Sequence, residues 1–149
     1  MATCGRKLLD EASATNPQRP ITLTPGQSVT VVIEAKRHKN RTSVFFDSGA
    51  VYDLSATGKW SDGVREIGPE GYSGESFLKH FLDWLRPSPD CNWLALLGVA
   101  ETRKPAFYIG TQATYEARQA GELICFANVV RGFYWKNSNA VELTITRIL

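Results

Sequence analysis

The stretch that decides the fold is ELICFAN-VVRGFYWKNSN-AVELTITRI, residues 122–148. Its two flanks, 122–128 and 140–148, are rich in β-branched and apolar residues, which is the composition of β-strands. The loop between them, 129–139, is aromatic and amide-rich, and it could present carbonyl oxygens and ring faces to a ligand. The stretch therefore predicts a binding module on a sheet scaffold and not an enzyme.

Short apolar runs of strand length recur along the rest of the chain, separated by turns rich in Gly, Pro and Asn. In one run Tyr52, Leu54 and Ala56 alternate with polar residues, as expected for a strand with one buried face. Many short strands of this kind are typical of an antiparallel sandwich or barrel. Besides the C-terminal pair, the predicted strands span residues 21–24, 28–35, 43–46, 51–57, 94–99 and 106–109.

Residues 76–86 are the exception, because their apolar positions recur at helical spacing. Pro87 and Pro89 end the pattern. We therefore expect one short helix that caps the sheets. The apolar positions are Phe77, Leu78, Phe81, Trp84 and Leu85.

A length of 149 residues favours one domain with a sizeable core. Residues 1–20 are polar and are expected to form an N-terminal arm, followed by a single β-sandwich domain over 21–149. The hydrophobic content of 43% and charged content of 21% are ordinary for a globular protein. The net charge of +2 is too small to favour a nucleic-acid partner by itself.

The expected location follows from what the chain lacks. Its start has no apolar run long enough for a signal peptide, and no stretch approaches the roughly 20 apolar residues of a membrane span. The three cysteines, Cys4, Cys91 and Cys125, cannot all pair within one chain and form no Cys-x-x-Cys motif. We expect a cytoplasmic protein with free thiols and no membrane span.

Catalytic and nucleic-acid-binding patterns are weak. His80 and Asp83 are close enough to share a face of the expected helix, but the sequence places no nucleophile beside them. His38 is far from His80, so the histidines lack metal-ligand spacing. The basic run 36–41 is interpreted as a solvated hairpin turn, because no aromatic residue interleaves it to stack on bases. No catalytic centre and no nucleic-acid partner are predicted.

Segment 55–63 has two interpretations. In the first, Trp60 is exposed at the end of a strand and stacks on a ligand, while Asp62 accepts hydrogen bonds from it. In the second, Trp60 folds back over the edge of the sandwich, and Asp62 and Gly63 simply make a turn. The sequence leaves both open.

Loop 129–139 also has two interpretations. It could bind a ligand, or its aromatic residues Phe133, Tyr134 and Trp135 could plug the end of the core. Three adjacent aromatic side chains are costly to expose together, so at least one should be buried.

Together the two loops resemble those of the PA-I-like (PA-IL) galactophilic bacterial lectins, which are small calcium-dependent β-sandwiches. The resemblance covers roughly residues 21–148 in layout, with its motifs in Pro25-Gly26 and the strand after it, in 58–60 and in 127–139. It implies a sandwich of the galactose-binding or jelly-roll type. The residues of 127–139 that match the family pattern are Asn128, Gly132, Tyr134, Asn137 and Ser138.

The same resemblance implies calcium, but the residues depart from the family at its ligands. The calcium-binding Asp of the family corresponds to Val129, and its Asn pair corresponds to Lys136 and Asn137. Calcium prefers roughly six to eight oxygen ligands, usually including a carboxylate. We therefore expect no cofactor and no tight calcium site. The Lys136 ammonium would take the place of the ion, unless it points to solvent with the loop held by aromatic packing.

The sequence thus predicts a lectin-like, carbohydrate-binding module with a glycan as partner. Its tryptophans would supply a stacking face, its amides would read hydroxyl groups, and its aspartate would accept hydrogen bonds. The alternative is a non-sugar module in which the same loops bind a protein or form a homo-oligomer. The candidate ligand-binding residues are Trp60, Asp62, Asn128, Tyr134, Trp135 and Asn137.

Overall fold

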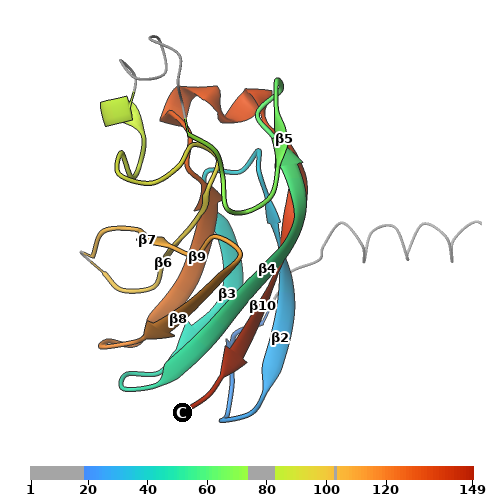
Figure 1. Cartoon of the computed structure of the whole chain (residues 1–149). Helices are drawn as coiled ribbons and strands as arrows, with labels where there is room; N and C mark the ends of the chain where they lie inside the picture. The colour runs from blue at the N-terminus through green and yellow to red at the C-terminus, as the bar shows by residue number, and fades with distance from the viewer. Residues whose placement is uncertain (1–18, 74–82, 103) are drawn as a thin grey trace, which may run out of the picture.

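Two β-sheets pack face to face in the computed structural model, which describes residues 19–73, 83–102 and 104–149 (Figure 1). Among the described strands, every pairing is antiparallel except that of β1 with β3. The first sheet has the order β1 (Ile21–Thr22), β3 (Asn40–Phe46), β9 (Gly121–Ala127), β6 (Leu96–Val99) and β7 (Phe107–Tyr108). The second has the order β2 (Ser28–Glu34), β10 (Ser138–Arg147), β4 (Val51–Ser61) and β5 (Glu66–Ile67), with β8 (Gln112–Glu116) paired to β4.

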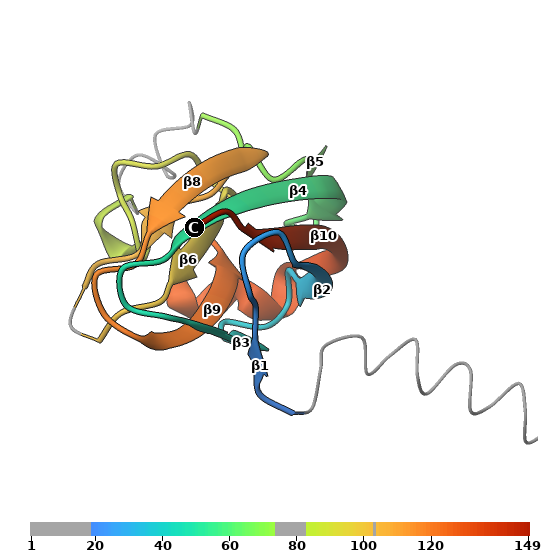
Figure 2. The same cartoon turned by 90° about the horizontal axis from the view of Figure 1, so that it is seen from below.

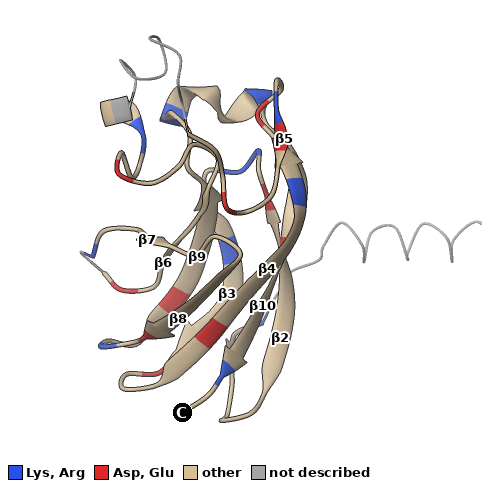
Figure 3. Cartoon of the chain, in the orientation of Figure 1, with Lys and Arg blue, Asp and Glu red and all other residues tan. Residues whose placement is uncertain are grey.

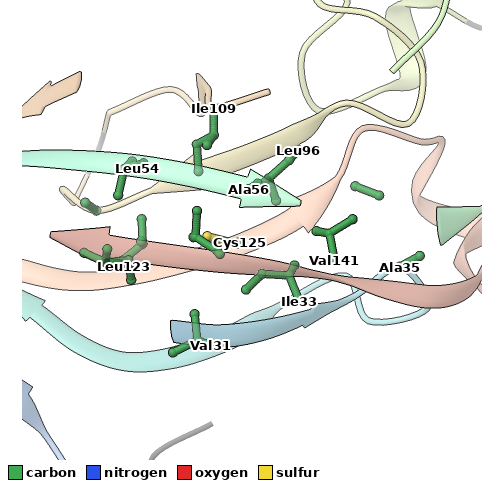
Figure 4. Packing of buried hydrophobic residues seen from close by; sticks show 14 of the residues in the cluster. Val31, Ile33, Ala35, Leu54, Ala56, Leu96, Ile109, Leu123, Cys125 and Val141 are labelled. Carbon is green, nitrogen blue, oxygen red and sulfur yellow. The ribbon is translucent and has the colours of Figure 1, made fainter. Parts of the chain in front are cut away.

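The core lies between the sheets and is supplied by alternate residues of each strand. Tyr52 and Leu54 of β4 are fully buried, as are Leu123 and Cys125 of β9 on the facing sheet. Figure 2 shows the two layers end-on, and Figure 4 shows aliphatic side chains from both layers meeting between them. This alternation is what a sandwich requires, because only one face of each sheet can be dry. The predicted all-β antiparallel sandwich is confirmed.

Strand β10 is a central strand of the second sheet. It pairs with β4 along its whole length, from Ser138 opposite Ser61 to Arg147 opposite Tyr52. On its other side it pairs with β2. The threonines that face solvent reinforce this pairing, since Thr144 Oγ1 lies 2.9 Å from Thr30 Oγ1.

The extent of several elements differs from expectation. Strand β4 continues past Gly58 to Ser61, so Trp60 lies within a strand and not after one. Strands β5 and β8 were not predicted, because they are short and carry few apolar residues. The described ranges contain two 3₁₀ segments, η1 (Asp83–Leu85) and η2 (Arg131–Lys136). The rest of the predicted helix 76–86 lies largely outside the described residues.

Three of the connections between strands gather at one end of the sandwich. Segment η2, the β4–β5 connection and the β2–β3 turn lie at the top in Figure 1, and the C-terminus lies at the opposite end. Most of the predicted N-terminal arm, residues 1–18, lies outside the described residues. No helix in the described ranges has the length and apolar character to span a membrane.

Candidate functional site

The fold brings the two candidate loops together. Ser61, the last residue of β4, pairs with Ser138 at the start of β10, so the loops that continue from these strands leave the sheet side by side. Gly63 packs on η2: a methyl group on its Cα would lie 3.0 Å from the Lys136 carbonyl oxygen. The backbone φ of Gly63 is +90°, which favours glycine for a second reason. Segments 62–65 and 131–136 therefore form one continuous surface.

Trp60 is not part of that surface. Its side chain is 0% exposed, and its indole Nε1 donates a hydrogen bond of 2.9 Å to the Leu94 carbonyl oxygen. The interpretation of Trp60 as a stacking face was wrong, because the added length of β4 keeps the alternation inward at this position. The alternative interpretation, in which Trp60 closes the edge of the sandwich, describes the structure.

The side chain of Asn128 also forms its hydrogen bonds within the fold. It is fully buried, and its amide Nδ2 donates to the carbonyl oxygens of Ser88, Cys91 and Asn92 at 2.8, 3.3 and 2.9 Å. Its Oδ1 accepts a hydrogen bond of 3.1 Å from the Ser88 backbone N–H. The side chain holds the turn at 88–92 and cannot reach a hydroxyl group of a ligand outside, which corrects its predicted role.

Tyr134 and Asn137 also face inward. The Tyr134 hydroxyl donates a 2.7 Å hydrogen bond to the Ala127 carbonyl oxygen, and burial raises the pKa of this phenol. Asn137 Nδ2 donates to the Ala35 carbonyl oxygen at 2.8 Å. Both side chains are buried. Of the three adjacent aromatic residues, Tyr134 is the one that plugs the core, and Asn137 ties η2 to the end of β2.

Asp62 organises its own loop. Its Oδ1 accepts hydrogen bonds from the backbone N–H groups of Val64 and Arg65 at 3.0 and 2.7 Å, and its Oδ2 accepts one from the Tyr72 hydroxyl. The Arg65 guanidinium lies 4.7 Å from the centre of the Tyr72 ring. Burial and then the Asp62 hydrogen bond raise the pKa of Tyr72. Asp62 thus acts first as a turn residue, and sequence reasoning missed Arg65 and Tyr72 because no motif links them to it.

Trp135 is the predicted site residue that the structure leaves most accessible. Its side chain is 67% exposed, and the neighbouring Phe133 is 41% exposed. The Lys136 ammonium lies 5.3 Å from the Trp135 ring centre and 4.9 Å from that of Phe133, within cation–π range. Phe133 and Trp135 therefore form an aromatic face on which the Lys136 ammonium rests.

Calcium does not fit these residues. Val129 is buried and offers no side-chain oxygen, while the amides of Asn128 and Asn137 are used within the fold. Asp62 is the nearby carboxylate, but three hydrogen-bond donors already occupy it. Over the described ranges, no cluster of three or more His, Cys, Asp or Glu side chains is suited to hold a metal ion. This donor set lacks the oxygen ligands that calcium needs.

Comparison with known proteins points to the fold more than to a family. No protein-family model matches the chain. A 96-residue stretch, 64% of the chain, is 27% identical to replication protein E1 of Bos taurus papillomavirus 6, and it spans only 15% of that protein's length. In structure, the chain is similar to the N-terminal domain of EclA, a PllA-like lectin, with a TM-score of 0.61 and 15% identity over 79% of this chain and 94% of that domain.

The structural match confirms the fold that the resemblance implied. A TM-score of 0.61 over 94% of a lectin domain shows that this chain has a lectin-like β-sandwich. An identity of 15% shows shared architecture only, since one fold hosts many functions. Placement among the PA-I-like lectins in particular stays a prediction.

Proposed function

We propose that this chain is a carbohydrate-binding module that needs no calcium. The observation that carries the proposal is the exposed indole of Trp135 on the surface formed by 62–65 and η2, in a sandwich similar to a lectin domain. A tryptophan face stacks on the apolar C–H face of a sugar ring and buries it from water. Trp135 supplies that face.

The polar part of the site consists of charged side chains around Trp135. The Lys136 ammonium has three donor hydrogens and remains at the surface, so it can donate to sugar hydroxyl groups while in contact with the ring. The Asp62 carboxylate is half-buried and fixes the loop 62–65 beside Trp135, so it shapes the polar side of the site. Asn128, Tyr134 and Asn137 support this surface from within instead of contacting the sugar.

A glycan array run with calcium and again with a chelator tests the proposal. We expect the same glycans to bind in both conditions. Trp135→Ala should abolish their binding, whereas Trp84→Ala, which removes an indole of similar exposure (70%) on η1, should leave it intact. Binding that disappears with the chelator would contradict calcium independence, and equal losses in the two variants would contradict the placement of the site.

A second function is favoured by the apolar character of the same surface. Val64 is 89% exposed, and Phe133 and Trp135 extend the apolar area. Exposed patches of this kind often mark protein contacts. In this alternative the surface binds a protein or a second copy of the chain. If no glycan binds, self-association is tested by sedimentation velocity. The wild type should then form a larger species that Val64→Lys does not form.

A further inference from the structure

A groove separate from the Trp135 surface lies on the outer face of the first sheet. Its volume is about 320 Å³, within the range typical of small-molecule sites. It is bounded by the β2–β3 turn, by η2 and by the outward side of β9 and β6. Tyr134, although largely buried, is among the residues that line it, and Trp135, the next residue, does not line it.

The floor of the groove is apolar because β9 carries apolar residues on both of its faces. Leu123 and Cys125 point into the core and are fully buried. Ile124 and Phe126 point outward, are only partly buried and line the groove together with Val99 of β6. A surface strand would ordinarily place polar residues at these positions. The floor therefore offers an aromatic and aliphatic contact to a ligand.

The rim of the groove is basic. His38 and Lys39 enter from the β2–β3 turn, and Arg131 enters from the start of η2. Figure 3 shows blue positions on both of these segments, at the same end of the sandwich. No carboxylate lines the groove in the described part of the chain. The rim thus concentrates positive charge over an apolar floor, which attracts anions.

The two arginines of the basic turn do not line the groove and have carboxylate partners of their own. Arg37 forms an ion pair with Glu34. Arg41 donates to Glu122, the acidic residue of β9, at 2.8 Å, and Glu122 also accepts a hydrogen bond from the Ser43 backbone N–H. Glu34 and Glu122 are therefore paired with these two arginines, and neither carboxylate lines the groove. The basic run 36–41 contains no aromatic residue of its own, but the fold places one beside it. The ring centre of Tyr134 lies 6.0 Å from that of His38.

We propose that this groove binds a small amphipathic anion: a flat apolar body of one or two rings that carries one carboxylate, sulfate or phosphate group. The rings would lie on Phe126 and Ile124 beside the Tyr134 ring. The anionic group would meet Lys39 and the planar guanidinium of Arg131, which suits oxyanions. This site shares η2 with the proposed sugar site but differs from it in its other residues, and it takes an anionic ligand instead of a neutral sugar.

The probe for the test is naphthalene-2-sulfonate, compared with its uncharged analogue naphthalene-2-sulfonamide. We expect the sulfonate to bind one site per chain and to shift amide NMR resonances of Val99, Ile124 and Phe126 without shifting those of Val64 and Trp135. The double variant Lys39→Gln with Arg131→Gln should weaken sulfonate binding about tenfold and leave binding of the uncharged analogue nearly unchanged. Lys59→Gln, an exposed lysine on β4 of the other sheet, is the matched control and should change neither.

Three outcomes would overturn the proposal. The first is absence of sulfonate binding to the wild type. The second is equal binding by the double variant, which would make the groove a merely apolar crevice. The third is resonance shifts confined to Val64 and Trp135, which would move the anion to the proposed sugar site. Because the melting temperature of each variant is measured in parallel, loss of binding through unfolding is recognised directly.

Discussion

The indole Nε1 of Trp60 and the carbonyl oxygen of Leu94 are joined by a hydrogen bond of 2.9 Å that links the two sheets. Trp60 belongs to β4, and Leu94 precedes β6 on the opposite layer. Leu94 adopts a φ of 60°, in the left-handed region that is costly for a non-glycine residue. The surroundings that hold this conformation include the Trp60 indole and a 3.0 Å hydrogen bond from the Leu94 N–H to the Asn128 carbonyl oxygen.

Removal of the Trp60 side chain should therefore destabilise the protein. Trp60→Ala is expected to lower the free energy of unfolding by about 3–5 kcal/mol, because it opens a cavity in the core. Trp60→Phe should lower the free energy of unfolding by less, because it keeps most of the packing although it loses the hydrogen bond. Urea unfolding measures both, with Trp135→Ala as the exposed control, expected within about 0.5 kcal/mol of the wild type. A stable Trp60→Ala protein would show that Trp60 is not a core residue.

Asn128 should be a structural residue as well. Asn128→Leu keeps the size of the side chain but removes the donor to the carbonyl oxygens of Ser88, Cys91 and Asn92. We expect a loss of about 2–4 kcal/mol, because the buried Asn128 amide forms several hydrogen bonds at once and leucine replaces none of them. Asn92→Ala removes one 3.2 Å hydrogen bond from an exposed amide to the Glu70 carbonyl oxygen and is the mild control. Equal, small losses in both variants in urea unfolding would contradict this role.

Glu101 should make stability depend on acid pH. A hydrogen bond from the Arg118 backbone N–H to the buried Glu101 carboxylate lowers the pKa of this group below its ordinary 4.5. A lowered pKa stabilises the fold above the unfolded-state pKa, and the contribution disappears as pH falls through the folded-state value. Glu101→Gln should be less stable than wild type at pH 7, and the gap should close below about pH 4.5. A gap of constant size between pH 7 and pH 3 would refute this.

The two described cysteines should differ in reactivity. Cys125 is fully buried in the core, and burial raises the pKa of its thiol, so the thiolate is scarce. Cys91 is a free, partly exposed thiol that accepts a hydrogen bond of 3.2 Å from the Ser88 hydroxyl. Iodoacetamide at neutral pH should modify Cys91 in the native protein and both residues in urea. Peptide mass mapping reads each site separately, and native labelling of Cys125 would mean that the core opens readily.

Periodicity was enough to predict the sandwich, because burial alternates along strands wherever a sheet has one dry face. Tyr52, Leu54 and Ala56 show this directly. The same rule applied two steps further would have placed Gly58 and Trp60 in the same strand, but Gly58 was interpreted as its end. Its φ of 102° is accommodated within the pairing with β10, so the strand continues.

The candidate site was harder to predict, because the same residue types serve scaffold and ligand. Amides and phenols can satisfy buried backbone groups as well as sugar hydroxyls, and only the fold reveals that Asn128, Tyr134 and Asn137 do the former. Asn139 has a backbone role instead: its φ of 66° is one that asparagine adopts more readily than most residues.

The central place of β10 has a consequence for how the chain matures. Because β10 lies between β2 and β4, those two early strands have no hydrogen-bonding neighbour between them until the last strand inserts. During synthesis β2 must wait until residues 138–147 leave the ribosome before it can join β4 in the second sheet, whereas β5 and β8 can pair with β4 earlier. Such long-range pairing is slow. The apolar faces of β2 and β4 meanwhile remain open to chaperones and to misassembly, and ribosomes stalled before residue 138 would hold a chain in which β2 has no place in this sheet.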